Sequence, residues 1–153
     1  MIDTGQTAPD FTLPQDGGAD VTLSALRPAP VVLYFYPKDD TSGCTKEAIA
    51  FSGLMSEFEA AGARVFGISK DSVEKHGKFR GKHDLSVPLL SDEAGDVCER
   101  YGTWAEKSMY GKKYWGIERS TFLIDGAGNV ARVWRKVKVP GHAEDVLEAV
   151  KAL

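Results

Sequence analysis

Hydrophobic positions change their spacing along the chain, and each spacing predicts a type of element. A continuous apolar and aromatic run occupies residues 31–36, which is typical of a strand buried on both faces of a sheet. Pro37 ends this run, and a polar loop follows as far as Gly43. From Thr45 to Gly62 the apolar residues recur at steps of three and four, which predicts one amphipathic helix.

The rest of the chain continues this alternation of strands and helices. Further strands are expected at 11–13, 21–23, 64–69, 87–90, 121–124 and 130–137. Further helices are expected at 72–83, 92–101 and 142–153, with an aromatic-rich loop at 103–118. This order favours a largely parallel sheet to which a closing hairpin adds antiparallel strands. We therefore expect a single α/β domain over residues 1–153 with a thioredoxin-like fold: a central mixed sheet flanked by helices, with an N-terminal β extension.

Composition excludes several classes of function. The 153 residues are 42% hydrophobic and carry a net charge of −3 without a long block of like charge, so no nucleic-acid partner is expected. A basic cluster within 132–138 alternates with valines, and we interpret it as the solvent-facing side of a strand. No apolar stretch approaches the ~18 residues of a membrane span, and the N-terminus does not resemble a signal peptide. We therefore expect a cytoplasmic protein without a membrane partner.

The chain contains two cysteines, Cys44 and Cys98. Cytoplasmic thiols are kept reduced, so a catalytic or free cysteine is favoured over a structural disulfide. The cysteines form no Cys-x-x-Cys pair and lie apart from the histidines, which argues against a zinc site. Cys44 stands where a buried strand gives way to a helix, and unpaired N–H groups in a first helical turn stabilise a thiolate, the reactive form. A small buried structural cysteine is the alternative interpretation.

The residues around Cys44 suit a reactive thiol. Thr41 is placed where its hydroxyl could donate to the sulfur or to a bound oxygen. Pro37 fixes the start of the loop and could shield the sulfur from water, while Gly43 permits close approach of the backbone.

The stretch 34–47, YFYPKDDTSGCTKE, resembles the peroxiredoxins, and most closely their bacterioferritin-comigratory or peroxiredoxin Q branch. Pro37, Thr41 and Cys44 match the family motif Pro-x-x-x-Thr-x-x-Cys, and the resemblance extends over nearly the whole chain. It implies a thiol peroxidase in which Cys44 attacks hydrogen peroxide or a small alkyl hydroperoxide and becomes a sulfenic acid. An external thiol such as thioredoxin or glutaredoxin would reduce that acid. No cofactor or metal is implied, and we expect a monomer rather than a dimer.

The same resemblance assigns a role to Arg119, which precedes the expected strand 121–124. An arginine at this place in the family donates to the peroxide oxygens, and a guanidinium has the fixed charge and donors for that task. Without the resemblance, a lone arginine before a strand would be interpreted as a solvated surface charge. Glu47 either orients Arg119 or merely complements the helix dipole.

The recycling step departs from that of the relatives that the chain resembles. Their usual resolving positions carry no cysteine here, because Ile49 and Arg80 occupy them. Cys98 shares a helix face with apolar residues, which favours a core position. We therefore expect a one-cysteine cycle in which Cys98 does not resolve the sulfenic acid.

The other polar and aromatic groups receive plainer interpretations. Four aromatic residues are interpreted as packing on the sheet edge, with an entrance for organic peroxides as the alternative: Trp104, Tyr110, Tyr114 and Trp115. The acidic pair and the histidines are interpreted as solvated, surface or cap residues: Asp39, Asp40, His76, His83 and His142.

Two rival functions remain to be weighed. A disulfide oxidoreductase is disfavoured because Glu47 stands where the second cysteine of a Cys-x-x-Cys motif beginning at Cys44 would lie. A redox-sensing or holdase-type binding protein that uses Cys44 only as a trigger stays open.

Overall fold

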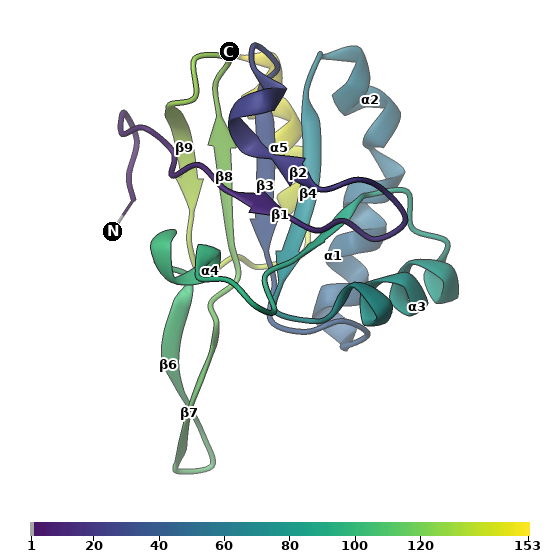
Figure 1. The fold of residues 1–153 in the computed structure, drawn as a ribbon, viewed down its shortest axis with the longest axis vertical. Helices are drawn as coiled ribbons and strands as arrows, with labels where there is room; N and C mark the ends of the chain where they lie inside the picture. Colours follow the sequence, from purple (N-terminus) through teal and green to yellow (C-terminus); the bar gives the residue numbers. More distant parts are fainter. Residues whose placement is uncertain (1) are drawn as a thin grey trace.

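The computed structural model describes residues 2–153 and centres on a mixed five-stranded sheet (Figure 1). Its strand order is β5-β4-β3-β8-β9, with β5 at Leu89–Ser91, β4 at Arg64–Ser69, β3 at Val31–Phe35, β8 at Ser120–Ile124 and β9 at Val130–Trp134. Strands β3, β4 and β5 run parallel, whereas β8 is antiparallel to both β3 and β9. The predicted thioredoxin-like α/β fold with a mixed sheet is confirmed.

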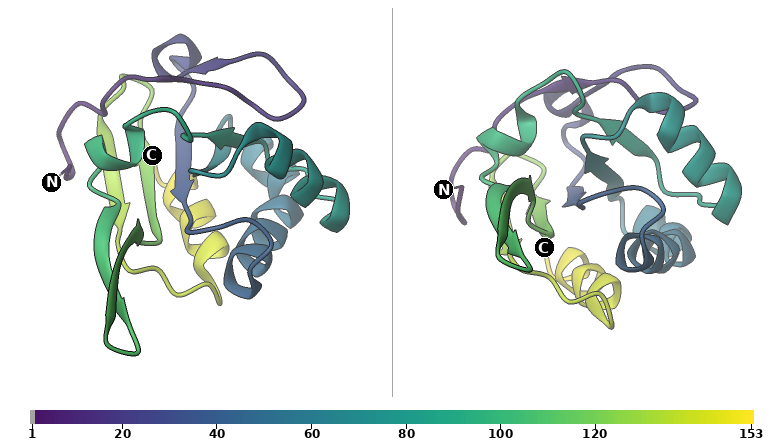
Figure 2. Two further views of the ribbon diagram at one scale, coloured as in Figure 1. Left: turned by 60° about the horizontal axis from the view of Figure 1, so that its bottom comes forward. Right: turned by 90° about the horizontal axis from the view of Figure 1, so that it is seen from below.

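Two layers cover the faces of this sheet (Figures 1 and 2). One layer contains α1 (Ser42–Gly53), α2 (Met55–Ala60), α3 (Val73–His83) and α5 (His142–Lys151). The other contains β1 (Thr12–Leu13), β2 (Val21–Thr22), the short 3-10 helix η1 (Leu23–Leu26) and α4 (Val97–Arg100).

Strand β3 lies in the middle of the molecule and is buried on both faces, as its continuous apolar run predicts. Its side chains alternate between the two cores: Tyr34 packs with α1, α2 and α5, whereas Leu33 and Phe35 pack with the N-terminal segment and α4.

Some predicted boundaries were wrong. The helix expected from Thr45 begins at Ser42 and is interrupted at Leu54, which separates α1 from α2. The helix expected at 92–101 is only Val97–Arg100, because the Asp92 carboxylate accepts the backbone N–H groups of Val97 and Cys98.

Strand β9 also stops earlier than predicted, at Trp134. Lys136 adopts a left-handed backbone conformation with φ 49°, which ends the extended run. The Arg135 guanidinium turns back and donates to the Ile2 carbonyl, so the expected solvent-facing basic stripe is only partly formed. Within the described residues, no helix combines the length and apolarity needed to cross a bilayer.

The aromatic segment predicted as a loop is a hairpin that projects from the body of the molecule (Figure 1). Its strands are β6 (Trp104–Met109) and β7 (Lys112–Ile117). Tyr110 and Gly111 form the turn with φ values of 50° and 77°, and positive φ at both central residues suits a tight hairpin turn. Tyr110 is 99% exposed, so the interpretation that it packs on the sheet edge was wrong.

Candidate active site

Cys44 lies in the first turn of α1, immediately after the loop that follows β3. Thr41 is the N-cap of this helix, so Cys44 is its third residue. The first N–H groups of a helix have no partner within the helix, and together with the helix dipole they stabilise an anion at this end. The Cys44 side chain is 1% exposed and packs in the core formed by α1, α2 and α5. Its position therefore combines a shielded sulfur with a local positive potential.

Arg119 reaches the sulfur from the neighbouring strand. It directly precedes β8, whose Ser120 pairs with Phe35 at the end of β3. This register brings the residue beside the loop that carries Cys44. The Arg119 Nη2 atom donates to Cys44 Sγ at 3.4 Å, and Nη1 donates to Glu47 Oε1 at 2.6 Å. The structure thus places Cys44, Arg119 and Glu47 in contact. This is the arrangement expected of one of the two interpretations of Glu47, in which it orients Arg119.

Glu47 lies one turn after Cys44 and is 1% exposed. Burial raises the pKa of Glu47 to about 7, although the adjacent Arg119 guanidinium opposes this shift. Its second oxygen, Oε2, has no hydrogen-bond partner within residues 2–153. The direct bond to Arg119 supports the interpretation that Glu47 orients the guanidinium.

Gly43 makes room for this arrangement. A Cβ atom at this position would lie 3.1 Å from Arg119 Nη2, which is closer than most side-chain contacts allow. The absence of a side chain at Gly43 therefore lets the guanidinium pass over the start of α1 toward the sulfur.

Thr41 and Pro37 frame the loop in different ways. The Thr41 hydroxyl donates to the Lys38 carbonyl at 2.9 Å rather than to the Cys44 sulfur. The predicted donation from the Thr41 hydroxyl to the sulfur is therefore not formed, because its proton is donated to Lys38. The hydroxyl oxygen can still accept a hydrogen bond. Pro37 is half-buried and lines a groove of about 350 Å³.

This groove runs from Pro37 along the β6–β7 hairpin. Its aromatic walls are Trp104, Tyr114 and Trp115, whereas Tyr110 stands apart at the tip of the hairpin. Lys107 also lines it and donates to the Ile117 carbonyl. Burial lowers the pKa of Lys107, and the nearby Arg119 guanidinium lowers it further. Three of the four aromatic residues thus line a groove that borders the Cys44 loop at Pro37 and Lys38, and an entrance for organic peroxides stays a prediction.

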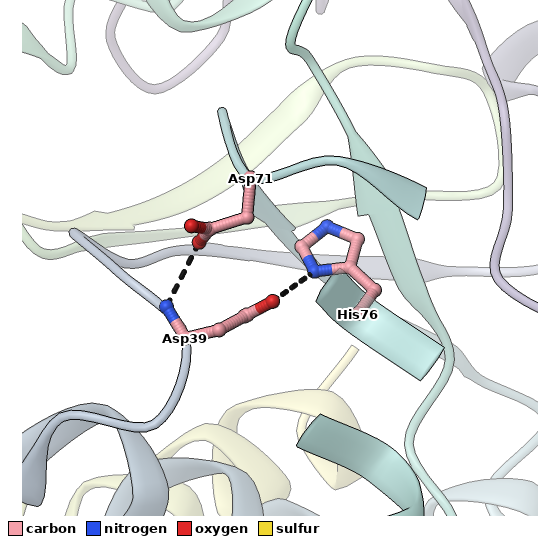
Figure 3. Close-up of side chains that lie close together, drawn as sticks. All are labelled: Asp39, Asp71 and His76. Carbon is pink, nitrogen blue, oxygen red and sulfur yellow. Dashed lines mark hydrogen bonds and ion pairs between the residues drawn. The ribbon is translucent and has the colours of Figure 1, made fainter. Parts of the chain in front are cut away.

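Sequence reasoning missed a buried polar cluster behind the active-site loop (Figure 3). Asp39 is 3% exposed and His76 is fully buried, so both interpretations as solvated or surface residues were wrong. His76 Nδ1 lies 2.6 Å from Asp39 Oδ2, and the Tyr36 hydroxyl donates to Asp39 Oδ1 at 2.5 Å. One signal was available, because His76 stands three residues before the buried Phe79 on α3 and therefore shares its apolar face.

His142 is a second buried histidine that was interpreted as a surface or cap residue. It begins α5, and its Nε2 lies 2.8 Å from the Thr121 hydroxyl on β8. Burial lowers the pKa of His142 to about 4, even though Asp145 and Glu144 lie near enough to oppose the shift. We therefore expect His142 to be neutral near pH 7.

Among the described residues, one group of side chains could bring three ligand atoms to a metal ion: Asp39, Asp71 and His76. Its atoms are already paired with one another and with the protein. The Nε2 atom of His76 lies 2.9 Å from the Leu90 carbonyl, and Asp71 accepts from the Asp39 backbone N–H and the Ser69 hydroxyl. This favours a hydrogen-bond network over a metal centre.

Cys98 occupies the opposite side of the sheet from Cys44. Cys44 belongs to the core under α1, α2 and α5, whereas Cys98 belongs to the core under α4 and the N-terminal segment. The Cys98 side chain is fully buried, which confirms its predicted core position, and burial raises the pKa of its thiol. Such a thiol forms little of the reactive thiolate.

Comparison with known proteins is consistent with this geometry. Residues 4–133 match the model of the AhpC/TSA family. The chain is 53% identical over 146 residues to a putative peroxiredoxin bcp of Coxiella burnetii, covering 95% of this chain and 97% of that protein. It is 47% identical over 150 residues to peroxiredoxin Bcp of Bacillus subtilis, covering 98% of this chain and 96% of that protein.

Solved structures agree with the sequence relatives. A structure of Xanthomonas campestris peroxiredoxin Q superposes with a TM-score of 0.91 at 46% identity and covers 98% of each chain. A mutant of Xylella fastidiosa PrxQ superposes with a TM-score of 0.94 at 41% identity, covering 99% of this chain and 97% of that one. The chain therefore belongs to the AhpC/TSA family and, within it, to the Bcp or peroxiredoxin Q branch of the thiol-dependent peroxidases.

Proposed function

We propose that Cys44 is the nucleophile of this peroxidase, in a single domain formed by the whole chain. The observation that carries the proposal is the contact of Arg119 with both the Cys44 sulfur and Glu47 at the start of α1. The Cys44 thiolate attacks the terminal peroxide oxygen, and an S–O bond forms as the O–O bond breaks. The bonding pair leaves with the second oxygen, which takes up a proton and departs as water or an alcohol. Cys44 remains as a sulfenic acid.

Arg119 stabilises the transition state of this displacement. Negative charge moves from the sulfur to the leaving oxygen, and a fixed guanidinium beside the sulfur can donate to both. Because Glu47 holds Nη1 at 2.6 Å, the guanidinium is oriented before the peroxide arrives. Thr41 accepts a hydrogen bond from the peroxide O–H, since its own hydroxyl donates to the Lys38 backbone carbonyl. Pro37 stands between the Cys44 loop and the groove and shields the sulfur from water.

The groove suits hydrogen peroxide and small alkyl hydroperoxides. Its aromatic walls provide apolar surface for the organic part of an alkyl hydroperoxide beside Pro37. A related protein supports this assignment, because structures of the Xanthomonas campestris bacterioferritin comigratory protein address its alkyl peroxide reduction activity.

Recycling follows a one-cysteine cycle with an external thiol such as thioredoxin or glutaredoxin. A first thiol attacks the sulfenic acid, releasing water and forming a mixed disulfide, and a second thiol releases Cys44 as a thiol. The two cysteines lie in cores on opposite faces of the sheet, and a disulfide needs Cα atoms within roughly 7 Å. A monomer in the cytoplasm, where thiols are kept reduced, completes the proposal.

The residue at the second usual resolving position helps to hold the structure together. Arg80 on α3 donates to Asp16 at 2.7 Å and thereby ties the helix to the N-terminal segment. Ile49 at the first usual position is an exposed apolar residue without redox chemistry.

The test compares peroxide consumption by the wild type, Cys44→Ser and Cys98→Ser, each with thioredoxin, thioredoxin reductase and NADPH. Cys44→Ser should lose turnover while retaining its circular dichroism spectrum, because serine is not ionised near neutral pH. Turnover that persists in Cys44→Ser would refute the assignment. A single oxidation of wild type without steady-state turnover would instead favour a redox sensor.

A further inference from the structure

We propose that Asp39 and His76 are positioning residues for the peroxidase reaction, forming a buried latch that fixes the Cys44 loop against α3. This inference rests on the proposed role of Cys44 and extends it to a region behind the sulfur. The latch consists of Asp39, His76 and Tyr36, and Figure 3 shows the close approach of Asp39 and His76.

Within the latch, His76 and Asp39 share one proton. The Leu90 carbonyl can only accept, so the Nε2 atom of His76 at 2.9 Å carries a proton. Its other nitrogen, Nδ1, lies 2.6 Å from Asp39 Oδ2, so a single proton lies between these atoms. The Tyr36 hydroxyl donates to the remaining oxygen of Asp39. Each of these polar groups is therefore satisfied away from water, which makes the arrangement costly to disturb.

Asp39 is also held through its backbone. Its N–H donates to Asp71 Oδ2 at 2.8 Å, and Asp71 immediately precedes the N-cap of α3. The next residue, Asp40, has a left-handed φ of 62° and contacts Lys82 and His83 at the other end of α3. The buried contacts of the loop are therefore those of Asp39, and the exposed ion pairs of Asp40 contribute little to holding it.

The buried contacts of Asp39 fix the start of α1. Asp39 and Asp40 lie between Pro37 and the N-cap Thr41, and Cys44 follows within the first turn. The loop is neither helix nor strand and contains only a turn at Asp39 and Asp40. Its buried contacts with α3 therefore help to define where the first turn of α1 lies relative to Arg119. Arg119 reaches the sulfur at 3.4 Å from a different strand, and a small displacement of α1 would lengthen that contact.

Loss of the latch should affect the reaction of Cys44 with peroxide more than its other reactions. The displacement needs the sulfur and the two peroxide oxygens in line, with Arg119 placed to donate to them. Misplacement by about 1 Å costs up to roughly a hundredfold in rate. Alkylation by iodoacetamide needs a thiolate but has no use for the Arg119 donors at a leaving oxygen. Loss of the latch should therefore slow the peroxide reaction much more than alkylation.

The experiment measures both second-order rate constants, by stopped-flow fluorescence for hydrogen peroxide and by mass spectrometry for iodoacetamide. In Asp39→Ala the peroxide rate should fall about tenfold or more, while the alkylation rate stays within about twofold of wild type or rises. Asp39→Asn should restore the peroxide rate, because its amide can donate to Nδ1 of a neutral His76 while its oxygen accepts from Tyr36.

Asp40→Asn is the matched control, since Asp40 lies in the same loop and contacts the same helix but is exposed, and asparagine tolerates its left-handed φ of 62°. Exposed ion pairs contribute little, so both rates should stay close to those of wild type. If Asp39→Ala does not fold, Tyr36→Phe replaces it, and the peroxide rate alone should still fall, by a smaller factor.

Two results would overturn the proposal. One is a folded Asp39→Ala whose peroxide rate matches wild type, and the other is an equal fall in both rates. Failure of the proposed function would look different, because Cys44→Ser would then keep its peroxide turnover.

Discussion

Replacement of Glu47 by glutamine should make the stability of the protein depend on pH in a defined way. Glutamine keeps the shape of the side chain and an oxygen that can accept from Arg119, but it cannot ionise. In the folded protein the pKa of Glu47 is raised by burial from its usual 4.5 to about 7. The folded state therefore binds more protons than the unfolded state between these values. The stability contributed by Glu47 is fully present below pH 4.5 and is lost as the pH rises through 7.

The size of the effect follows from the shift. One pKa unit corresponds to about 1.36 kcal/mol, so the raised pKa of Glu47 corresponds to about 3 kcal/mol of unfolding free energy. At low pH the glutamine variant and the wild type should have similar stability, because both side chains are neutral. Above about pH 7.5 the variant should be more stable by about 3 kcal/mol, since it no longer buries a charge whose Oε2 lacks a partner within residues 2–153.

Comparison with wild type at each pH is essential, because His142 acts in the opposite direction. Burial lowers the pKa of His142 from 6.5 to about 4. Its contribution is present above pH 6.5 and is lost as the pH falls through 4. Between pH 4.5 and 6.5 the two groups therefore offset each other in the wild type, and Glu47→Gln should expose the rise in stability caused by His142.

The assay is urea unfolding under reducing conditions, followed by tryptophan fluorescence at several pH values from about 4 to 8. Glu57→Gln on α2 is the control, since Glu57 is exposed. The difference in unfolding free energy between Glu47→Gln and wild type should grow with pH, whereas that of the control should stay flat. A difference for Glu47→Gln that does not change with pH would refute the reasoning.

Three further predictions concern the chemistry at Cys44. Arg119→Lys keeps the charge but loses the planar set of donors, so the stopped-flow peroxide rate should fall by about a hundredfold; an unchanged rate would remove Arg119 from the site. Gly43→Ala places a Cβ 3.1 Å from Arg119 Nη2, so the rate should fall severalfold while urea stability changes little; full activity would show that the guanidinium can shift freely. Cys98→Ser should retain thioredoxin-supported turnover, and non-reducing mass spectrometry of wild type after one equivalent of peroxide should show no Cys44–Cys98 disulfide. Quantitative formation of that disulfide would contradict the one-cysteine cycle.

The sequence predicts the parts of the site that are encoded locally. The buried strand, the loop from Pro37 and the helix carrying Cys44 follow one another within residues 31–53, so their hydrophobic pattern is enough to place them. Arg119 lies 75 positions away from Cys44 in the chain. Its role came from the family resemblance, because the pattern before β8 does not distinguish it from a surface arginine.

The parts that sequence analysis missed depend on distant contacts or on unusual turns. Asp39 is buried because His76, 37 residues later, supplies its partner, and nothing near Asp39 in the sequence indicates this. The β6–β7 hairpin was predicted as a loop because Tyr110-Gly111 lacks the Asn-Gly or Asp-Gly signal, although Gly111 supplies the freedom for positive φ. The interruption at Leu54 was hidden because α2 continues the apolar spacing of α1, with Phe51 and Phe58 in the same core.

The arrangement of α3 bears on how a reductant reaches Cys44. The latch at Asp39 and the ion pair between Arg80 and Asp16 both hold this helix in place, and neither has to break for the proposed cycle. On this proposal the sulfenic acid would form and be reduced without unfolding of α3, although the Cys44 side chain is only 1% exposed. The groove borders the Cys44 loop at Pro37 and Lys38, and we expect peroxide and reducing thiol to approach through it in turn. Substitutions in its aromatic wall, such as Trp115→Ala, should consequently change the rate constants of both half-reactions, whereas substitutions at the exposed tip, such as Tyr110→Ala, should change neither.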